Sequence, residues 1–227
     1  IAHVVDGFKP AQRKLMWVLS TTYGERVTPN IKVAQLSGEV AKLTHYKHGE
    51  ESLSGTTVRM AQDFPICGNN LNLLVPEGMY GNRHGDDPAS PRYIYTCAER
   101  IAQYIFPAAD VPVLDILESE GHAIEPRYMV PVIPMVLCNG TSGTGTGWSS
   151  DVASYDPASI IEWCRAYNNS LRSGEVCEPL RLKPYLEGFQ GTVTDKGDGK
   201  YIFRGVMEQT DARTVRVTDL PGFTSSF

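Results

Sequence analysis

The sequence contains no long hydrophobic run and has fewer positive than negative charges; the first argues against a membrane-spanning protein, and the second limits how the chain can bind nucleic acid. No stretch reaches the roughly 18 uninterrupted apolar residues that indicate a membrane-spanning helix, so no membrane partner is expected. The chain carries 21 Lys and Arg against 26 Asp and Glu, a net charge of −5. An acidic chain binds nucleic acid only where its basic residues gather on one face, because phosphate contacts need local cations.

Cysteines are few, odd in number and scattered, which argues against disulfides. The five residues form no CxxC pair and no metal-ligand spacing, so we expect reduced thiols in an intracellular protein. His45, His48 and Glu50 lie close in sequence but are too few for tetrahedral zinc, and no metal ligand is predicted. The start, IAHVVDGFKP, lacks an initiating Met and a secretory signal, which suggests a piece of a longer polypeptide.

Basic residues gather in the first fifty positions, where seven Lys and Arg stand against four Asp and Glu. There, residues 10–20 and 31–43 read as two helices joined by a short turn, and the second carries Lys32 near its start. The arrangement fits a helix-turn-helix, although most helix pairs serve only for packing. The remaining elements predicted for this part are a third helix over 51–63, a strand over 71–76 and a return strand from Ile94, which complete a winged helix.

From about residue 121 the pattern indicates a second α/β unit. Residues 127–138 read as an apolar strand bent by two prolines, and Asp156 caps a helix that Gly174 ends. From Gly191 the apolar period becomes two, which predicts an antiparallel hairpin and a further strand. The fold class is therefore α+β. Two helical faces are predicted to be buried, namely Ile31, Leu36, Val40 and Leu43 in the second helix, and Ile160, Ile161, Cys164, Tyr167 and Leu171 in the late one.

The loop between the two early strands ends by presenting Arg92 and Tyr93 side by side. It reads EGMYGNRHGDDPASPRYIYT over residues 77–96 and is rich in Gly, Pro and Asp. A phenol has a pKa of about 10, so it is a poor nucleophile unless cations stabilise its anion and orient its target. Arg meets that need because it stays charged and grips phosphate with a two-pronged fork. The alternative is an ordinary surface loop whose Tyr covers the edge of a core.

A second glycine-rich stretch, NGTSGTGTGW over residues 139–148, looks like a phosphate cradle. A P-loop needs Lys and then Ser or Thr after its last Gly, whereas Trp148 and Ser149 follow Gly147 here. A nucleotide-binding domain built on these glycines is therefore the weaker interpretation. We expect a tight turn that lets the backbone approach another group closely.

Six segments, in this order along the chain, strongly resemble the breakage-reunion region of type IIA DNA topoisomerases, above all the eukaryotic and large-virus enzymes. They are VDGFKPAQRK (5–14), IKVAQLSGEV (31–40), YKHGEESL (46–53), NNLNLLVPEGMYGNR (69–83), ASPRYIYT (89–96) and PMVLCNGTSGTGTGWS (134–149). The resemblance implies a winged-helix DNA-cleavage domain over residues 1–120. It also implies an incomplete α/β tower domain with an antiparallel sheet over residues 121–227.

The resemblance also implies a catalytic set. The family's nucleophile falls on Tyr93 and its neighbouring Arg on Arg92, while the Arg of KPxQRK falls on Arg13 and the His of HHGE on His48. The Tyr attacks a backbone phosphodiester and leaves a 5′-phosphotyrosyl link and a free 3′-hydroxyl, so the break can be resealed. Two guanidinium groups suit the crowded charge of that transition state, and we expect His48 to orient or deprotonate the hydroxyl.

For DNA binding we expect contacts from Lys9, Lys14 and Lys32 to backbone phosphate, and from Thr144 at a base step. Thr144 stands where the family has an Ile that wedges between base pairs, and a smaller polar wedge predicts a shallower bend. Pro91 and Asp86 also depart from the family pattern. Pro91 stiffens the approach to Arg92, and Asp86 stands where related sequences carry Lys.

The resemblance implies double-stranded DNA as a partner and a homodimer, because passing one duplex through another needs paired cuts. Mg²⁺ and ATP belong to a metal-binding domain and an ATPase domain of the same polypeptide, neither of which is visible in this sequence. The expected location is the nucleus, or a cytoplasmic viral replication site for a viral protein. The alternative function is a winged-helix module that binds DNA and performs no chemistry.

Overall fold

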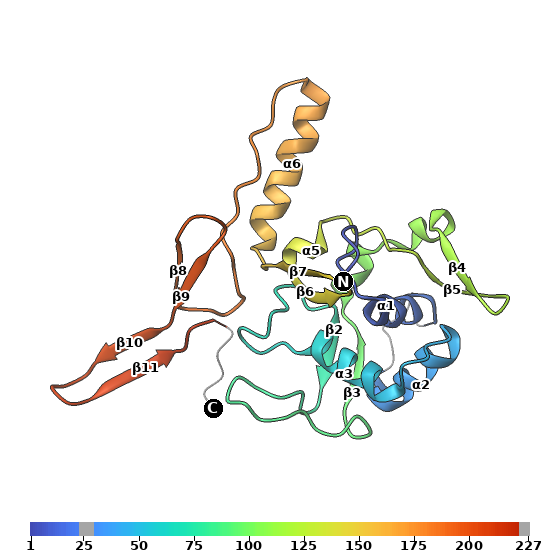
Figure 1. Cartoon of the computed structure of the whole chain (residues 1–227), viewed down its shortest axis with the longest axis horizontal. Helices are drawn as coiled ribbons and strands as arrows, with labels where there is room; N and C mark the ends of the chain where they lie inside the picture. Colours follow the sequence, from blue (N-terminus) through green and yellow to red (C-terminus); the bar gives the residue numbers. More distant parts are fainter. Residues whose placement is uncertain (23–29, 223–227) are drawn as a thin grey trace.

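A computed structural model describes residues 1–22 and 30–222 and shows helices mixed with small antiparallel sheets (Figure 1). Within these residues no helix is both long and apolar enough to cross a membrane. The first helices and sheet form a rounded body, from which a long helix and a β-hairpin of the second half project (Figure 1). The chain therefore mixes helices and strands as predicted, and its strands form small separate antiparallel sheets.

Three helices pack around one apolar core in the first half. α1 (Pro10–Thr22) begins at a proline, whose fixed φ and missing N–H suit a first helical turn. The sequence predicts the second helix from Ile31, but Ile31–Lys32 form the short strand β1 and α2 (Val33–Leu43) starts afterwards. Leu36 and Val40 are buried as predicted, whereas Leu43 is 46% exposed and Val33, outside the predicted face, is fully buried. The third helix is α3 (Glu50–Ala61).

A three-stranded antiparallel sheet with the order β1-β3-β2 lies against these helices. Its central strand β3 (Tyr95–Ala98) pairs on one side with β2 (Leu74–Glu77) and on the other with β1. Lys32 lies opposite Tyr95 in this register. The loop that carries Tyr93 therefore returns into the middle of the sheet, where it is held from both sides.

The segment after β3 connects the first half to the second. It contains α4 (Arg100–Ile105), the 3-10 helix η1 (Ala108–Val113) and the hairpin of β4 (Ile116–Ser119) with β5 (His122–Pro126). The predicted strand over 127–138 is wrong. Its prolines supply no N–H groups for a ladder, and Pro134 instead precedes the one-turn helix α5 (Met135–Cys138).

The glycine-rich stretch folds as a hairpin rather than as a loop leading into a helix. β6 (Thr141–Gly145) pairs with β7 (Trp148–Val152), so Thr144 lies opposite Ser149. At its base Gly140 has a φ of 64°, and a Cβ there would lie 2.5 Å from the Val152 carbonyl oxygen. The expected close backbone approach is therefore present, and it joins the two ends of the hairpin.

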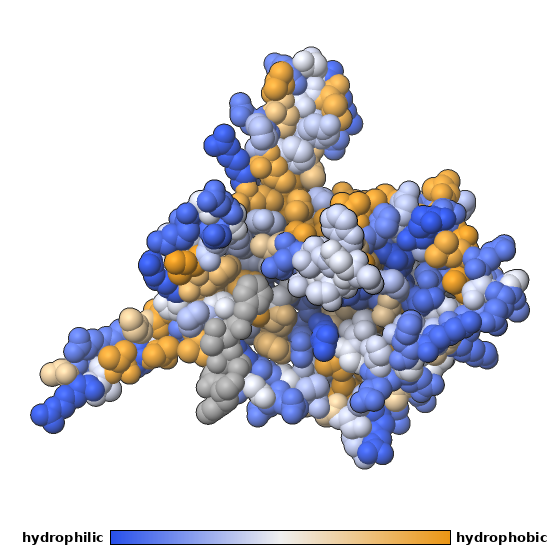
Figure 2. Space-filling view, viewed as in Figure 1, coloured by the Kyte–Doolittle hydropathy of each residue, from blue (hydrophilic) through white to orange (hydrophobic). Residues whose placement is uncertain are grey.

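The late helix begins and ends where the sequence predicts. α6 (Pro157–Ser173) starts after Asp156, whose carboxylate accepts hydrogen bonds from the Ala158 and Ser159 N–H groups, and it ends at the left-handed Gly174. Its predicted buried face is correct at the start, where Ile160 is fully buried and Cys164 packs against the core, and wrong farther along, because α6 projects from the body. Tyr167 and Leu171 are exposed, and Figure 2 shows apolar surface along this projection.

Two hairpins follow α6, where the sequence predicts one hairpin and a further strand, because residues 200–209 divide into two strands. The first joins β8 (Thr192–Asp195) with β9 (Tyr201–Arg204), and the second joins β10 (Val206–Gln209) with β11 (Val215–Asp219).

A buried amide connects the first half of the chain to the second. The Asn70 side chain donates to the carbonyls of Cys138, Tyr155 and Tyr185 at 2.9, 3.2 and 3.0 Å. Its oxygen accepts from the Glu187 N–H at 2.8 Å. Because one side chain bonds to all these backbone groups, Asn70 fixes the relative position of four segments.

Candidate active site around Tyr93

The backbone around Tyr93 is fixed, while its side chain lies in solvent. The Val33 N–H donates to the Ile94 carbonyl and the Ala34 N–H to the Pro91 carbonyl, both at 3.1 Å, and these bonds tie the loop to the start of α2. Ile94 is 1% exposed and anchors the strand, whereas Tyr93 is 68% exposed. A hydroxyl held in this way is accessible to a macromolecule without rearrangement of the core.

Two cations accompany the phenol. The Arg92 guanidinium carbon lies 5.2 Å from the centre of the Tyr93 ring, and Lys32 Nζ lies 5.8 Å from the centre of the Tyr95 ring. In the part of the chain that the structure describes, neither Arg92 nor Lys32 forms an ion pair. The positive end of the α2 dipole adds to this charge. The site therefore has an exposed phenol and positive charge that no ion pair among the described residues neutralises.

Tyr80 lies in the same loop as Tyr93 but has a structural role. It is 3% exposed, and its hydroxyl donates to the Tyr95 carbonyl at 2.6 Å. Burial raises the pKa of Tyr80 to about 12. Its hydroxyl is thus committed as a donor, which leaves Tyr93 as the loop's accessible phenol.

Arg13 is engaged elsewhere. Its Nε donates to Asp6 Oδ2 at 2.6 Å, and its Nη2 donates to Asp6 Oδ1 at 3.0 Å and to the Phe8 carbonyl at 2.8 Å. Asp6 is fully buried and Arg13 is 7% exposed. Within the described residues no hydrogen bond, ion pair or ring contact joins Arg13 to Tyr93.

His48 lies beyond the other end of α2. It is exposed, and its ring meets the Tyr46 ring edge-on with 5.3 Å between centres. Tyr93 lies at the first residues of α2, an 11-residue helix about 16 Å long at 1.5 Å per residue. The described contacts of one chain thus place Arg92 at Tyr93 and Lys32 at the nearby Tyr95, and they bring neither Arg13 nor His48 to Tyr93.

The remaining predicted DNA contacts differ in accessibility. Lys14 is largely buried, and its Nζ donates to Glu125 at 2.7 Å and to the Thr44 carbonyl at 2.6 Å, so it holds β5 against α1. Lys9 and Thr144 are exposed. Asp86 accepts a hydrogen bond from Asn82 inside the loop.

Across the described ranges, no group of three or more His, Cys, Asp or Glu side chains is arranged to hold a metal ion.

Sequence reasoning missed the partner of Arg83. This residue lies in the same loop as Tyr93 and forms an ion pair with Asp219 at the end of β11. Its Nη2 also donates to the Leu220 carbonyl at 3.0 Å. Arg83 stands in the GNR segment, but no local pattern indicates a partner so distant in the chain.

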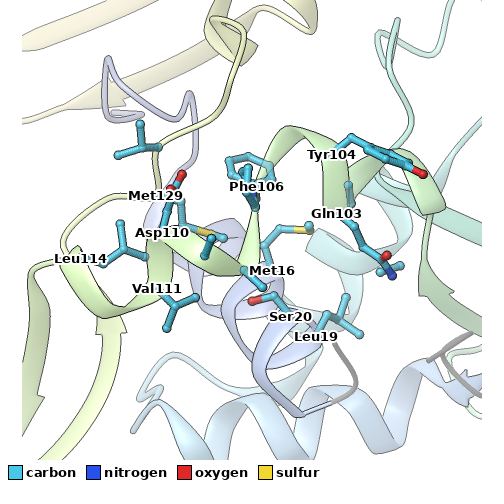
Figure 3. Close-up of a pocket in the computed structure, with 16 residues that line it drawn as sticks. Met16, Leu19, Ser20, Gln103, Tyr104, Phe106, Asp110, Val111, Leu114 and Met129 are labelled. Carbon is cyan, nitrogen blue, oxygen red and sulfur yellow. The ribbon is translucent and has the colours of Figure 1, made fainter. Parts of the chain in front are cut away.

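An apolar cavity of about 540 Å³ lies apart from this site, between α1, α4 and η1. Phe106, Met16 and Met129 meet at its centre, and Leu19 and Leu114 lie near its edges (Figure 3). Its lining includes neither Tyr93 nor a basic residue. The cavity therefore contributes nothing to the chemistry of the exposed phenol.

Comparisons with known proteins agree along the whole chain. The model of the DNA gyrase/topoisomerase IV A-subunit family matches residues 1–226. DNA topoisomerase 2 of Trypanosoma brucei brucei is 41% identical over 223 residues, which are 97% of this chain and 18% of that protein. DNA topoisomerase 2-beta of Mus musculus is also 41% identical over 223 residues, 97% of this chain and 13% of that protein.

A solved structure matches as well. The crystal structure of the Plasmodium falciparum topoisomerase II DNA-binding, cleavage and re-ligation domain aligns with a TM-score of 0.89 and 37% identity. The alignment covers 98% of this chain and 29% of that one. The chain thus spans less than a fifth of the length of these curated relatives.

Proposed function

Because this chain belongs to the DNA gyrase/topoisomerase IV A-subunit family, we propose that it is the breakage-reunion part of an ATP-dependent type II DNA topoisomerase. Its substrate is double-stranded DNA, which it cuts transiently so that a second duplex passes through the break. The observation that carries this proposal is a tyrosine with a fixed backbone and a 68% exposed side chain, next to an unpaired guanidinium.

In the proposed step, the Tyr93 oxygen bonds to a backbone phosphorus while its proton leaves to a base. The bond from phosphorus to the 3′ oxygen breaks, and that oxygen takes up a proton to become a hydroxyl. One phosphoester replaces another, so the reverse reaction reseals the strand. Arg92 stabilises the negative charge that grows on the phosphoryl oxygens, and Lys32 holds an adjoining phosphate.

Arg13 and His48 receive different roles in this proposal. Arg13 already donates to both carboxylate oxygens of Asp6 and to the Phe8 carbonyl, and so fixes the turn before Lys9. Within a single chain we therefore assign Arg13 the role of positioning Lys9. His48 is exposed and free to meet DNA from the far end of α2, where it orients or deprotonates a hydroxyl. Lys14 serves the packing of β5 on α1 rather than phosphate binding.

The described residues do not fit a magnesium site, since no acidic cluster of sufficient size lies among them. We therefore place Mg²⁺ and ATP in the metal-binding and ATPase domains of the longer polypeptide and route no step through them. The 227 residues alone should bind DNA without cleaving it. Robust Mg²⁺-dependent nicking by the isolated chain would contradict this assignment.

The proposed domains are a winged helix followed by a tower. Three helices and the β1-β3-β2 sheet support the winged helix, with the loop between β2 and β3 as its wing. A boundary between residues 120 and 121 would cut the turn of the β4–β5 hairpin, so we place it after Pro126. Double-strand cleavage implies a homodimer. The expected location is the nucleus, or a cytoplasmic viral replication site.

Trapping the covalent adduct on supercoiled DNA tests the proposal. The full-length protein carrying this chain is incubated with plasmid and Mg²⁺, quenched with detergent and scored for DNA-linked protein. Tyr93→Phe should abolish the adduct and keep DNA binding, and Tyr104→Phe, which alters another exposed tyrosine, should leave both unchanged. The non-catalytic winged-helix alternative requires that the unaltered protein form no adduct.

A further inference from the structure

We propose that Arg59 and Lys9 form a second phosphate-binding site, away from Tyr93, which holds the DNA backbone beside the β6–β7 hairpin. The inference rests on the proposed function, because it takes duplex DNA as the ligand. It adds Arg59, a residue that no sequence pattern singled out.

The site is a polar cavity of about 400 Å³ between the start of α1, the end of α3 and β6. A phosphate with its first waters fits in such a volume. Polar side chains line much of the wall. They are Gln12, Gln62, Asn69, Asn139, Thr141 and Ser142. The side-chain amides of Gln62, Asn69 and Asn139 already donate to backbone carbonyls, so the hydroxyls of Thr141 and Ser142 are donors that this wall offers to phosphate oxygens and to water.

The charge of the lining is positive. In the described part of the chain neither Lys9 nor Arg59 has an ion-pair partner. The cavity's carboxylate, Asp6, is already satisfied: each oxygen accepts from Arg13, and the Phe8 and Met129 N–H groups donate at 2.9 Å. An anion entering the cavity therefore meets two uncompensated cations and no free carboxylate oxygen.

Arg59 reaches this cavity from the exposed stripe of α3. Glu51, Gly55 and Arg59 recur every four residues and are all exposed, so they lie on one side of the helix. The Asn69 side chain donates to the Arg59 carbonyl at 2.8 Å and to the Gln62 carbonyl at 2.9 Å, which fixes the end of the helix. Asp63 is exposed beyond that end and does not pair with Arg59.

A purely structural explanation exists for Arg59, since a cation near a helix C-terminus interacts favourably with the helix dipole. That explanation predicts a change in stability and no change in DNA affinity. It also leaves unexplained why Lys9, from a different element, lines the same cavity.

Lys9 links the cavity to the hairpin. Its Cε lies 3.6 Å from the point where a Cβ on Gly143 would sit, so the side chain lies against β6 at the residue before Thr144. A phosphate bound by Lys9 and Arg59 therefore belongs to the DNA strand that passes the β6–β7 hairpin. Because Thr144 is a small polar wedge, backbone contacts at this point offset part of the cost of bending the duplex.

The salt dependence of DNA binding tests this site. The full-length protein is titrated onto a fluorescent duplex of about 30 base pairs in EDTA, which prevents metal-dependent cleavage, between about 50 and 200 mM KCl. Each lost phosphate contact lowers the slope of log K against log salt by about 0.9. Arg59→Ala and Arg59→Gln should each show this loss, and Arg59→Lys should retain most of the slope. Arg165→Ala, at an exposed position on α6, serves as the matched control.

An unchanged slope in Arg59→Ala and Arg59→Gln, with normal binding by the unaltered protein, would overturn the site and leave the proposed function standing. Failure of the unaltered protein to bind the duplex would overturn both. A loss of slope in Arg165→Ala equal to that in Arg59→Ala would also reject the site, because any surface charge would then produce the effect.

Discussion

Arg83 and Asp219 form an ion pair that fastens the loop carrying Tyr93 to the end of β11. Asp219 is 4% exposed and also accepts from the Gln190 N–H at 2.7 Å, and the Arg83 side chain is 23% exposed. The pair joins an early loop to a late hairpin. The pair therefore ties the loop that ends at Tyr93 to the second half of the chain.

Asp219→Asn should destabilise the protein by about 2 kcal/mol. This is less than the roughly 3–5 kcal/mol typical of breaking a fully buried pair, because Arg83 retains contact with water. Urea unfolding measures the change. Glu208→Gln breaks the exposed Arg216–Glu208 pair and should cost about 0.5 kcal/mol or less. Equal losses in the two variants would refute a special role for the buried pair.

The same pair predicts a dependence of stability on pH. Burial raises the pKa of Asp219, but the Gln190 N–H and Arg83 outweigh it, so the pKa lies below the ordinary 3.8. A lowered carboxyl pKa contributes stability that is complete above the ordinary value and is lost as the pH falls through the folded value. The stability difference between the parent protein and Asp219→Asn should therefore persist at neutral pH and shrink in acid.

Asn70→Ala should cost about 3 kcal/mol, because it leaves several buried backbone groups without partners. Thermal or urea unfolding measures the loss. Asn168→Ala, at an exposed position on α6, is the control and should change stability by less than about 0.5 kcal/mol. A near-neutral Asn70→Ala would mean that Asn70 does not hold the two halves together.

Arg92→Ala should slow adduct formation by about 100-fold or more, the usual effect of removing a donor that stabilises transition-state charge. Arg92→Lys should recover only part of the rate, since an ammonium cannot make the two-pronged contact. Single-turnover cleavage of a labelled duplex gives the rates. Arg100→Ala, an exposed arginine just beyond β3, should cleave normally, and a similar defect there would weaken the assignment.

Thr144→Ile should leave the cleavage chemistry intact and change the preferred cleavage sites, because an apolar wedge enters the base stack more deeply. Sequencing of the cleaved ends gives the site map. Thr192→Ile places the same change on an exposed strand position of β8, away from the hairpin, and should keep the parent map. Identical maps for all three proteins would reject a wedge role for residue 144.

Local chemistry explains what the sequence predicts well. Asp156 and Gly174 set the ends of α6 through their own hydrogen bonds and backbone angles, so the signal needs no distant contact. The β8–β9 hairpin likewise follows from its turn and its period of two. Arg92 and Tyr93 are neighbours in a single loop, so their proximity can be read from the sequence without knowledge of the fold.

Distant contacts explain what the sequence does not predict. Val33 is buried because β3 returns against the start of α2, and Tyr167 is exposed because α6 projects from the body. The partners of Arg13 and Arg83 depend on chain segments brought together only by the fold. Periodicity finds the apolar side of a helix but cannot tell which part of that side meets another element.

Identifying the residue that bears the DNA tests the central claim most directly. The trapped adduct of the full-length protein is digested with nuclease and protease, and the peptide that retains a nucleotide is sequenced by mass spectrometry. We expect a phosphotyrosyl bond at Tyr93, joined to the 5′ end of the cut strand. A nucleotide on the exposed Tyr104 or on any other residue, or a link to a 3′ end, would contradict it.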